Sequence, residues 1–152
     1  KFKDQFWDSD VQYYYTVAKE TGRWPVWMNY RTFSKEKILL GLCMGDYAKK
    51  ADLMSKEALT EDGLKVLKNV WEDDVGEVQN ILRTSWLNDP FTKGAYSFPR
   101  VDNSKKDFEN LAEPIDNKLF FCGEHTNLEY LATTHGALFT GIRAAKEVMK
   151  AT

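Results

Sequence analysis

The chain of 152 residues has a hydrophobic content of 43% and an aromatic content of 14%, enough for the packed core of one ordinary domain. Its 21 basic and 23 acidic residues give a formal net charge of −2 without a basic stripe, which argues against direct binding of nucleic acid. No apolar run approaches the ~20 residues needed to span a bilayer, and the first residues lack a signal-peptide pattern. We therefore expect a globular protein without a nucleic-acid or membrane partner and favour a cytoplasmic location.

The first part of the chain predicts a small sheet followed by helices. Three β-like segments separated by turn-prone stretches predict an antiparallel meander: VQYYYTVA (11–18), PVWMNYRTF (25–33) and KILLGLCM (37–44). Residues 46–55 predict a short helix. A second helix is expected to begin at Thr60 as its N-cap and to pack on the sheet through one apolar face formed by Leu64, Leu67, Val70 and Trp71.

The rest of the chain predicts a long irregular segment and then a sharper C-terminal pattern. Residues 76–114 are expected to be loop with one short strand at ILRTSW (81–86). Residues 115–124 predict a turn and a buried strand, and residues 132–151 predict an amphipathic helix. Two cysteines in separate apolar runs are expected to be buried thiols rather than a disulfide or a metal pair, namely Cys43 and Cys122.

The C-terminal strand, loop and helix form the strongest candidate for a binding site. The first turn of a helix has unpaired N–H groups and a positive dipole end, and the small residues Ala132, Gly136 and Ala137 let a bulky ligand approach the backbone. Glu124 could accept hydrogen bonds from sugar-type hydroxyls. The same pattern occurs in strand–loop–helix units that bind nothing, so the residues alone leave both interpretations open.

The run LFFCGEHTNLEYLATTHGALFTGIRAAKEV (119–148) closely resembles the C-terminal signature of the flavin-containing amine oxidases. This family includes polyamine and spermine oxidases, monoamine oxidases and the lysine-specific histone demethylase. In the family, the glutamate of GEHT contacts the FAD sugar or ribityl chain, and the helix beginning ATTHGA points its N-terminus at the flavin and the pyrophosphate. The resemblance therefore implies an FAD-binding set of Gly123, Glu124, Ala132, Thr133 and Thr134.

A second block, TSWLNDPFTKGAYSFP (84–99), resembles the family segment that lies beside the flavin ring and the substrate. Trp86 and Tyr96 match its aromatic positions, where an aromatic face can border the flavin or hold the amine. Ala95 stands where monoamine oxidases carry the cysteine that links FAD, so the resemblance implies a non-covalent flavin. Thr133 stands where those enzymes carry a tyrosine, which implies a more open pocket of the polyamine oxidase and histone demethylase kind.

The opening KFKDQFWD also resembles the family, so the resemblance covers essentially the whole chain and implies an α+β fold. Residues 1–114 would be part of the substrate-binding domain, with an antiparallel sheet and packed helices. Residues 115–152 would be the last strand and helix of the FAD-binding domain. No G-x-G-x-x-G occurs, and the family's active-site lysine belongs to an earlier segment. We therefore expect a C-terminal fragment that lacks an N-terminal dinucleotide-binding segment, contains no catalytic residue and is inactive alone.

The implied activity is that of a flavoprotein oxidoreductase. An amine, polyamine-like by the resemblance, is oxidised to an imine while oxygen is reduced to hydrogen peroxide. One alternative keeps the flavin and changes the substrate class, as in amino acid oxidases. The other is a non-catalytic binding or scaffold fragment. His125 and His135 are expected to be structural, since two histidines without further clustered ligands do not form a metal site.

Overall fold

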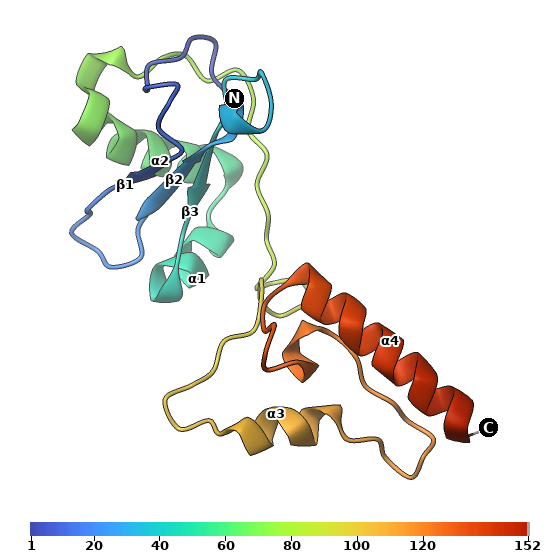
Figure 1. Cartoon of the computed structure of the whole chain (residues 1–152). Coiled ribbons are helices and arrows are strands. Elements are labelled where there is room, and N and C mark those ends of the chain that lie inside the picture. Colours follow the sequence, from blue (N-terminus) through green and yellow to red (C-terminus); the bar gives the residue numbers. More distant parts are fainter. Residues whose placement is uncertain (152) are drawn as a thin grey trace. The chain divides into compact units, whose positions relative to one another are not determined.

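The computed structural model describes residues 1–151 and divides into two compact units, which are considered separately (Figure 1). The first unit is Lys1–Lys93, and the second begins at Gly94. The first contains the sheet and two helices, and the second contains two further helices. The predicted α+β class is confirmed. No helix within residues 1–151 is both long enough and apolar enough to cross a bilayer.

The sheet of the first unit has three antiparallel strands in the order β1-β2-β3, which confirms the predicted meander. Its strands are β1 (Tyr13–Tyr15), β2 (Val26–Asn29) and β3 (Leu39–Leu42). Trp27 on the central strand pairs with Tyr14 on one side and Gly41 on the other. A short 3-10 helix, η1 (Tyr30–Thr32), follows β2, and the side chain of Asn29 caps it by accepting from the N–H of Arg31.

Two helices follow the sheet: α1 (Gly45–Leu53), as predicted, and α2 (Lys56–Trp71), which ends in the 3-10 turn η2 (Glu72–Asp74). The N-cap of α2 is Ser55, whose side chain accepts from the N–H of Ala58, so the prediction of Thr60 is wrong. Thr60 lies inside the helix and its hydroxyl donates to the carbonyl of Lys56 at 2.6 Å. Both residue types cap well, and the earlier one is used here.

The apolar face of α2 was only partly predicted. Leu67 is buried as expected, and Leu64 and Trp71 pack against the core from partly buried positions. Val70, however, is 51% exposed, and Val66 takes its place in the interior. The pattern of apolar residues indicated the helix correctly but misjudged which stripe faces the sheet, because the tryptophan rings pack closely against Gly63 and the buried stripe runs through Gly63, Val66 and Leu67.

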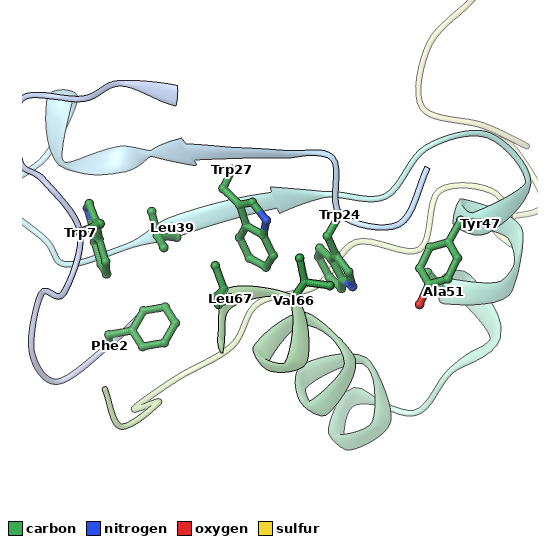
Figure 2. Packing of buried hydrophobic residues seen from close by; sticks show 9 residues of the cluster. All are labelled: Phe2, Trp7, Trp24, Trp27, Leu39, Tyr47, Ala51, Val66 and Leu67. Carbon is green, nitrogen blue, oxygen red and sulfur yellow. The ribbon is translucent and has the colours of Figure 1, made fainter. Parts of the chain in front are cut away.

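Tryptophans dominate the core between the sheet and α2 (Figure 2). Trp24 and Trp27 stack with ring centroids 5.1 Å apart and an interplanar angle of 18°. Two glycines make room for these rings: a Cβ on Gly41 would lie 2.6 Å from Trp27, and one on Gly63 would lie 3.3 Å from it. Figure 2 shows Val66 and Leu67 rising from α2 toward the same indoles.

A partly buried carboxylate ties α2 to the rest of this unit. Asp62 accepts hydrogen bonds from Arg23 Nη2 at 2.6 Å, from Trp24 Nε1 at 2.7 Å and from the hydroxyl of Tyr47. Burial, and then the hydrogen bond to the charged Asp62, raise the pKa of Tyr47 to about 12. The three donors come from the turn before β2 and from α1, so Asp62 joins segments that are distant in sequence.

The second unit contains α3 (Lys105–Ala112), the 3-10 turn η3 (Glu124–Thr126) and α4 (Thr134–Ala151). The long C-terminal helix is confirmed. The helix α3 corrects the prediction that this part of residues 76–114 is loop: Ser104 and Asp107 form a capping box, and Phe108 is buried. The polar run at residues 103–106 is typical of a helix start as well as of the loop expected there.

Two predicted strands are absent from the described residues. Residues 81–86 and 119–123 have no strand conformation, and only an isolated bridge pairs Ile115 with Leu119. The physical reason is that a strand requires a hydrogen-bonded neighbour, and no strand within residues 1–151 runs beside either segment. Without a sheet over it, Cys122 is exposed rather than buried, whereas Cys43 is half-buried; both thiols are free.

Candidate functional site

The site is built around a sharp bend at Gly123. This residue has φ 133° and ψ 161°, a conformation essentially restricted to glycine. A Cβ here would also lie 2.6 Å from Cε1 of His125. The bend continues into η3, where the N–H of Thr126 donates to the carbonyl of Gly123 at 3.0 Å. The chain therefore reverses within a few residues and presents Glu124 at the turn.

The helix α4 fixes this bend with two polar side chains. The hydroxyl of Thr140 accepts from the N–H of Gly123 at 2.9 Å and lies 3.1 Å from the carbonyl oxygen of the same residue. One turn further along, Arg143 donates through Nη2 to the carbonyl of Phe121 at 2.7 Å and through Nη1 to that of Thr126 at 3.2 Å. Thr140 is only 2% exposed. Backbone groups on both sides of Gly123 are thus satisfied by α4.

The carboxylate of Glu124 joins three segments. Its Oε1 accepts from the N–H of Ser97 at 3.0 Å, and its Oε2 accepts from the N–H of Ala132 at 2.7 Å. Partial burial by itself raises the pKa of Glu124, but the hydrogen bonds from Ser97 and Ala132 and the electrostatic influence of nearby His125 outweigh it and lower the pKa below its ordinary value. Glu124 is therefore charged at neutral pH, with one N–H group on each oxygen.

The start of α4 leaves donors open. The Oγ1 of Thr133 accepts from the N–H of Gly136 at 3.0 Å and donates to the carbonyl of Tyr130 at 2.7 Å, so Thr133 acts as the N-cap side chain. The N–H groups of Thr134 and His135 have no acceptor within residues 1–151. Such donors, at the positive end of a helix of 18 residues, suit a phosphate or another electron-rich oxygen.

The structure brings together all five predicted cofactor-binding residues: Gly123, Glu124, Ala132, Thr133 and Thr134. Of these five, the groups that fit a flavin nucleotide are the open N–H of Thr134 and the carboxylate of Glu124, whose oxygens retain lone pairs for a hydroxyl; the N–H groups of Gly123 and Ala132 are bound to Thr140 and Glu124. The hydroxyl of Thr133 is already used by the helix cap. Whether these residues bind FAD stays a prediction, since the geometry displays donors and acceptors rather than a ligand.

The two predicted aromatic residues lie in different compact units. Trp86, in the first, is 50% exposed, and its carbonyl accepts from the hydroxyl of Thr92. The turn that follows is organised by Asp89, whose carboxylate accepts from the N–H groups of Phe91 and Thr92 at 2.9 Å. Tyr96, in the second unit, is 64% exposed and directly precedes Ser97, which Glu124 binds. Their role as an aromatic wall stays a prediction.

The two histidines are held by neighbouring residues. His135 packs edge-on against Tyr130, with ring centroids 4.9 Å apart, and against Phe139 at 6.0 Å. His125 lies against Gly123. Among residues 1–151, no three His, Cys, Asp or Glu side chains gather where they could hold a metal ion.

Sequence reasoning missed the three residues that hold the site in shape, namely Ser97, Thr140 and Arg143. The available signal was on α4: a threonine and an arginine three positions apart occupy a face that also carries the buried Gly136 and Ala144. Polar side chains on the inner face of a helix need hydrogen-bond partners, and backbone carbonyl groups beside a glycine bend can accept such hydrogen bonds. Ser97 contributes its backbone N–H at 3.0 Å, and its hydroxyl also helps to lower the pKa of Glu124, but a lone serine in a segment expected to be loop gave no signal.

Comparison with known proteins identifies relatives along almost the whole chain. Residues 1–149 match the family model described as flavin containing amine oxidoreductase. "Lysine-specific histone demethylase 1 homolog 2" of Oryza sativa subsp. japonica is 32% identical over 99% of this chain and 20% of its own length. "Lysine-specific histone demethylase 1 homolog 3" of Arabidopsis thaliana is 31% identical over 98% of the chain and 9% of its own length. "Possible lysine-specific histone demethylase 1" of Drosophila melanogaster is 29% identical over 94% of the chain and 17% of its own length. The chain thus spans a fifth or less of these three relatives.

Proposed function

The chain belongs to the flavin-containing amine oxidoreductase family, and from this premise we propose that it forms part of an FAD-dependent oxidase acting on the carbon–nitrogen bond of an amine. The observation that carries the proposal is the arrangement around Glu124: a charged carboxylate beside a helix start whose N–H groups at Thr134 and His135 are open. We assign residues 1–114 to the substrate-binding domain and residues 115–152 to the FAD-binding domain, although residues 94–114 pack with the second unit.

In this proposal, residues 123–135 orient the cofactor. The open N–H groups of Thr134 and His135 donate to electron-rich oxygens, and a free lone pair on Glu124 accepts from a sugar or ribityl hydroxyl. A bound flavin would supply the redox chemistry, in which the amine loses two electrons and two protons to become an imine and oxygen takes them up as hydrogen peroxide. Ala95 stands where monoamine oxidases carry the cysteine that links FAD and has no atom for such a bond, so we propose that non-covalent contacts hold the cofactor.

By their match to the aromatic positions of the family's second block, Trp86 and Tyr96 are each proposed to contact the amine. An exposed indole or phenol face attracts an ammonium group and covers an alkyl chain, so both rings suit a flexible aliphatic amine. We propose a polyamine-like substrate. A second candidate, an alkylated lysine side chain in a histone, is favoured by the names of the relatives. Both are amines on flexible aliphatic chains, and they differ in whether the amine is free or attached to a peptide.

The test uses the complete parent protein. We expect flavin absorbance in the purified protein, full release of the flavin on denaturation, and amine-dependent formation of hydrogen peroxide. Turnover of spermine, spermidine or their acetylated forms supports the polyamine version, whereas turnover of an N-methylated lysine peptide alone supports the second candidate. A flavin-containing protein that turns over only an amino acid would support the alternative of an amino acid oxidase. Purified parent protein without any flavin would sink the proposal in favour of a binding or scaffold role.

Residues 1–152 expressed alone provide a complementary measurement. We propose that they supply only one wall of the cofactor site, so the dialysed chain should be colourless and inactive. The flavin-to-protein ratio from absorbance, after incubation with excess FAD and gel filtration, measures this. A stoichiometric ratio would contradict the proposal that a further dinucleotide-binding segment is required.

A further inference from the structure

We propose that Glu124 is a positioning residue that assembles both ends of the site through the backbone. Its carboxylate holds the N–H group next to Tyr96 and the N–H group next to the cap of α4, so a single side chain sets the aromatic residue and the helix start together. The functional meaning of this arrangement rests on the proposed function, but the clamp itself requires no flavin. We call it the Glu124 clamp, formed by Glu124 with the N–H groups of Ser97 and Ala132.

Each carboxylate oxygen of Glu124 accepts one of the two hydrogen bonds. Oε1 accepts from Ser97, which lies 27 residues earlier, and Oε2 accepts from Ala132, which lies eight residues later. At 3.0 Å and 2.7 Å these are ordinary and short N–H···O distances to an ionised acceptor. All three residues belong to the second compact unit. The clamp therefore closes two separate loops onto η3.

Only a carboxylate of this length satisfies both N–H groups. An amide at the same position has one acceptor oxygen and one donor nitrogen, so one of the two N–H groups would face another donor. A carboxylate shortened by one methylene would fall short of at least one N–H group. The bend at Gly123 and its bonds to Thr140 fix where the Glu124 backbone lies, which leaves little freedom to compensate.

Each end of the clamp controls a neighbouring group. Ala132 has φ 61°, in the left-handed region that disfavours alanine, and its bond to Glu124 holds it there. The next residue, Thr133, caps α4, and the open N–H groups follow. At the other end, the N–H that is bound belongs to the residue directly after Tyr96. Releasing Glu124 would therefore loosen the tyrosine and the helix start at once.

If the sole role of Glu124 were a direct hydrogen bond to a hydroxyl of the cofactor, its variants would behave differently. An amide can accept from or donate to a hydroxyl, so Glu124→Gln would keep such a contact nearly intact. The clamp loses one N–H partner in the same variant. The two roles can therefore be separated by comparing Glu124→Gln with Glu124→Ala.

The decisive experiment follows the clamp in the flavin-free chain of residues 1–152. In a ¹⁵N-labelled sample taken from pH 7 to pH 3, the amide resonances of Ser97 and Ala132 should move with one common midpoint that lies below the ordinary pKa of a glutamate. The movement should vanish in Glu124→Gln and persist in the control Glu113→Gln, a glutamate of the same unit outside the clamp. Because His125 also faces Glu124, the Gln variant shows whether the movement depends on the Glu124 carboxylate itself. Different midpoints for the two amides, or a common titration that survives in Glu124→Gln, would overturn the proposal.

A second measurement uses the parent protein with its flavin. We expect Glu124→Gln to weaken flavin binding and to raise KM for the amine, each about tenfold or more, and to approach Glu124→Ala in both. Glu113→Gln should match the wild type. If Glu124→Gln binds flavin and amine like the wild type, the clamp is refuted while the proposed function stands. If the parent binds no flavin in any form, the proposed function fails while the amide titration still tests the clamp.

Discussion

The substitution Thr140→Val tests how α4 holds the glycine bend. The hydroxyl of Thr140 accepts from the N–H of Gly123 at 2.9 Å and lies within hydrogen-bond distance of the carbonyls of Gly123 and Ala137. A hydroxyl has one proton, so it accepts once and donates to one of these carbonyls at a time. Valine keeps the shape and the β-branch but leaves the Gly123 N–H without an acceptor at a site where residue 140 is 2% exposed.

A buried donor without a partner costs roughly 1–3 kcal/mol, so we expect a loss of about 2 kcal/mol, or roughly 30-fold in the opening equilibrium. The assay is amide hydrogen exchange at Thr126, whose N–H donates to the Gly123 carbonyl and reports on the turn without being altered itself. Thr60→Val is the matched control, since that hydroxyl donates only within its own helix. Exchange at Thr126 that is unchanged in Thr140→Val, or changed equally by the control, would refute this reasoning.

Three further perturbations follow from the structure. Gly123→Ala should lower the free energy of unfolding in urea by about 2 kcal/mol because residue 123 has a positive φ. The control Gly94→Ala, with open space around it, should be near neutral, and equal effects of the two substitutions would contradict a strained bend at Gly123. Asp62→Asn should destabilise the first unit by about 3 kcal/mol, since three residues donate hydrogen bonds to that carboxylate. The control Asp46→Asn, at an exposed position, should change the stability little. A loss below about 1 kcal/mol in Asp62→Asn would count against a stabilising role of these hydrogen bonds. Because the pKa of Glu124 is lowered on folding, its contribution is complete above the unfolded-state value and is lost as the pH falls through the folded one. The stability difference between wild type and Glu124→Gln should therefore shrink from pH 7 to pH 3, and a difference that grows on acidification would contradict the assignment.

Local sequence patterns predicted the elements that depend on local signals. The meander of β1 to β3 follows from branched and aromatic runs between turns, and α4 follows from its apolar periodicity. The strand expected at residues 119–123 failed because pairing requires a neighbour, which a single segment does not encode. The helix α3 was missed because its capping box, Ser104 with Asp107, lies in a polar run that also suits a turn.

The sequence signature predicted the residues of the candidate site but not the residues that hold them in place. Glu124 and the helix start at Ala132 to Thr134 lie together as the pattern indicates. Their supports come from hydrogen bonds to backbone atoms across 17 to 27 residues, from Thr140, Arg143 and Ser97. Backbone N–H and carbonyl groups are the same in nearly every residue, so the sequence does not mark which ones a distant side chain will bind.

We propose that residues 123–135 form part of the flavin site of an amine oxidase. The most direct measurement mixes the flavin-containing parent protein with spermine, spermidine or an N-methylated lysine peptide in the absence of oxygen and follows the visible flavin absorbance. We predict that at least one of these amines bleaches the flavin and that admitting oxygen restores the colour with one hydrogen peroxide per flavin. A parent protein that contains no flavin, or a flavin that none of these amines reduces, would show that residues 123–135 do not belong to the flavin site of an amine oxidase.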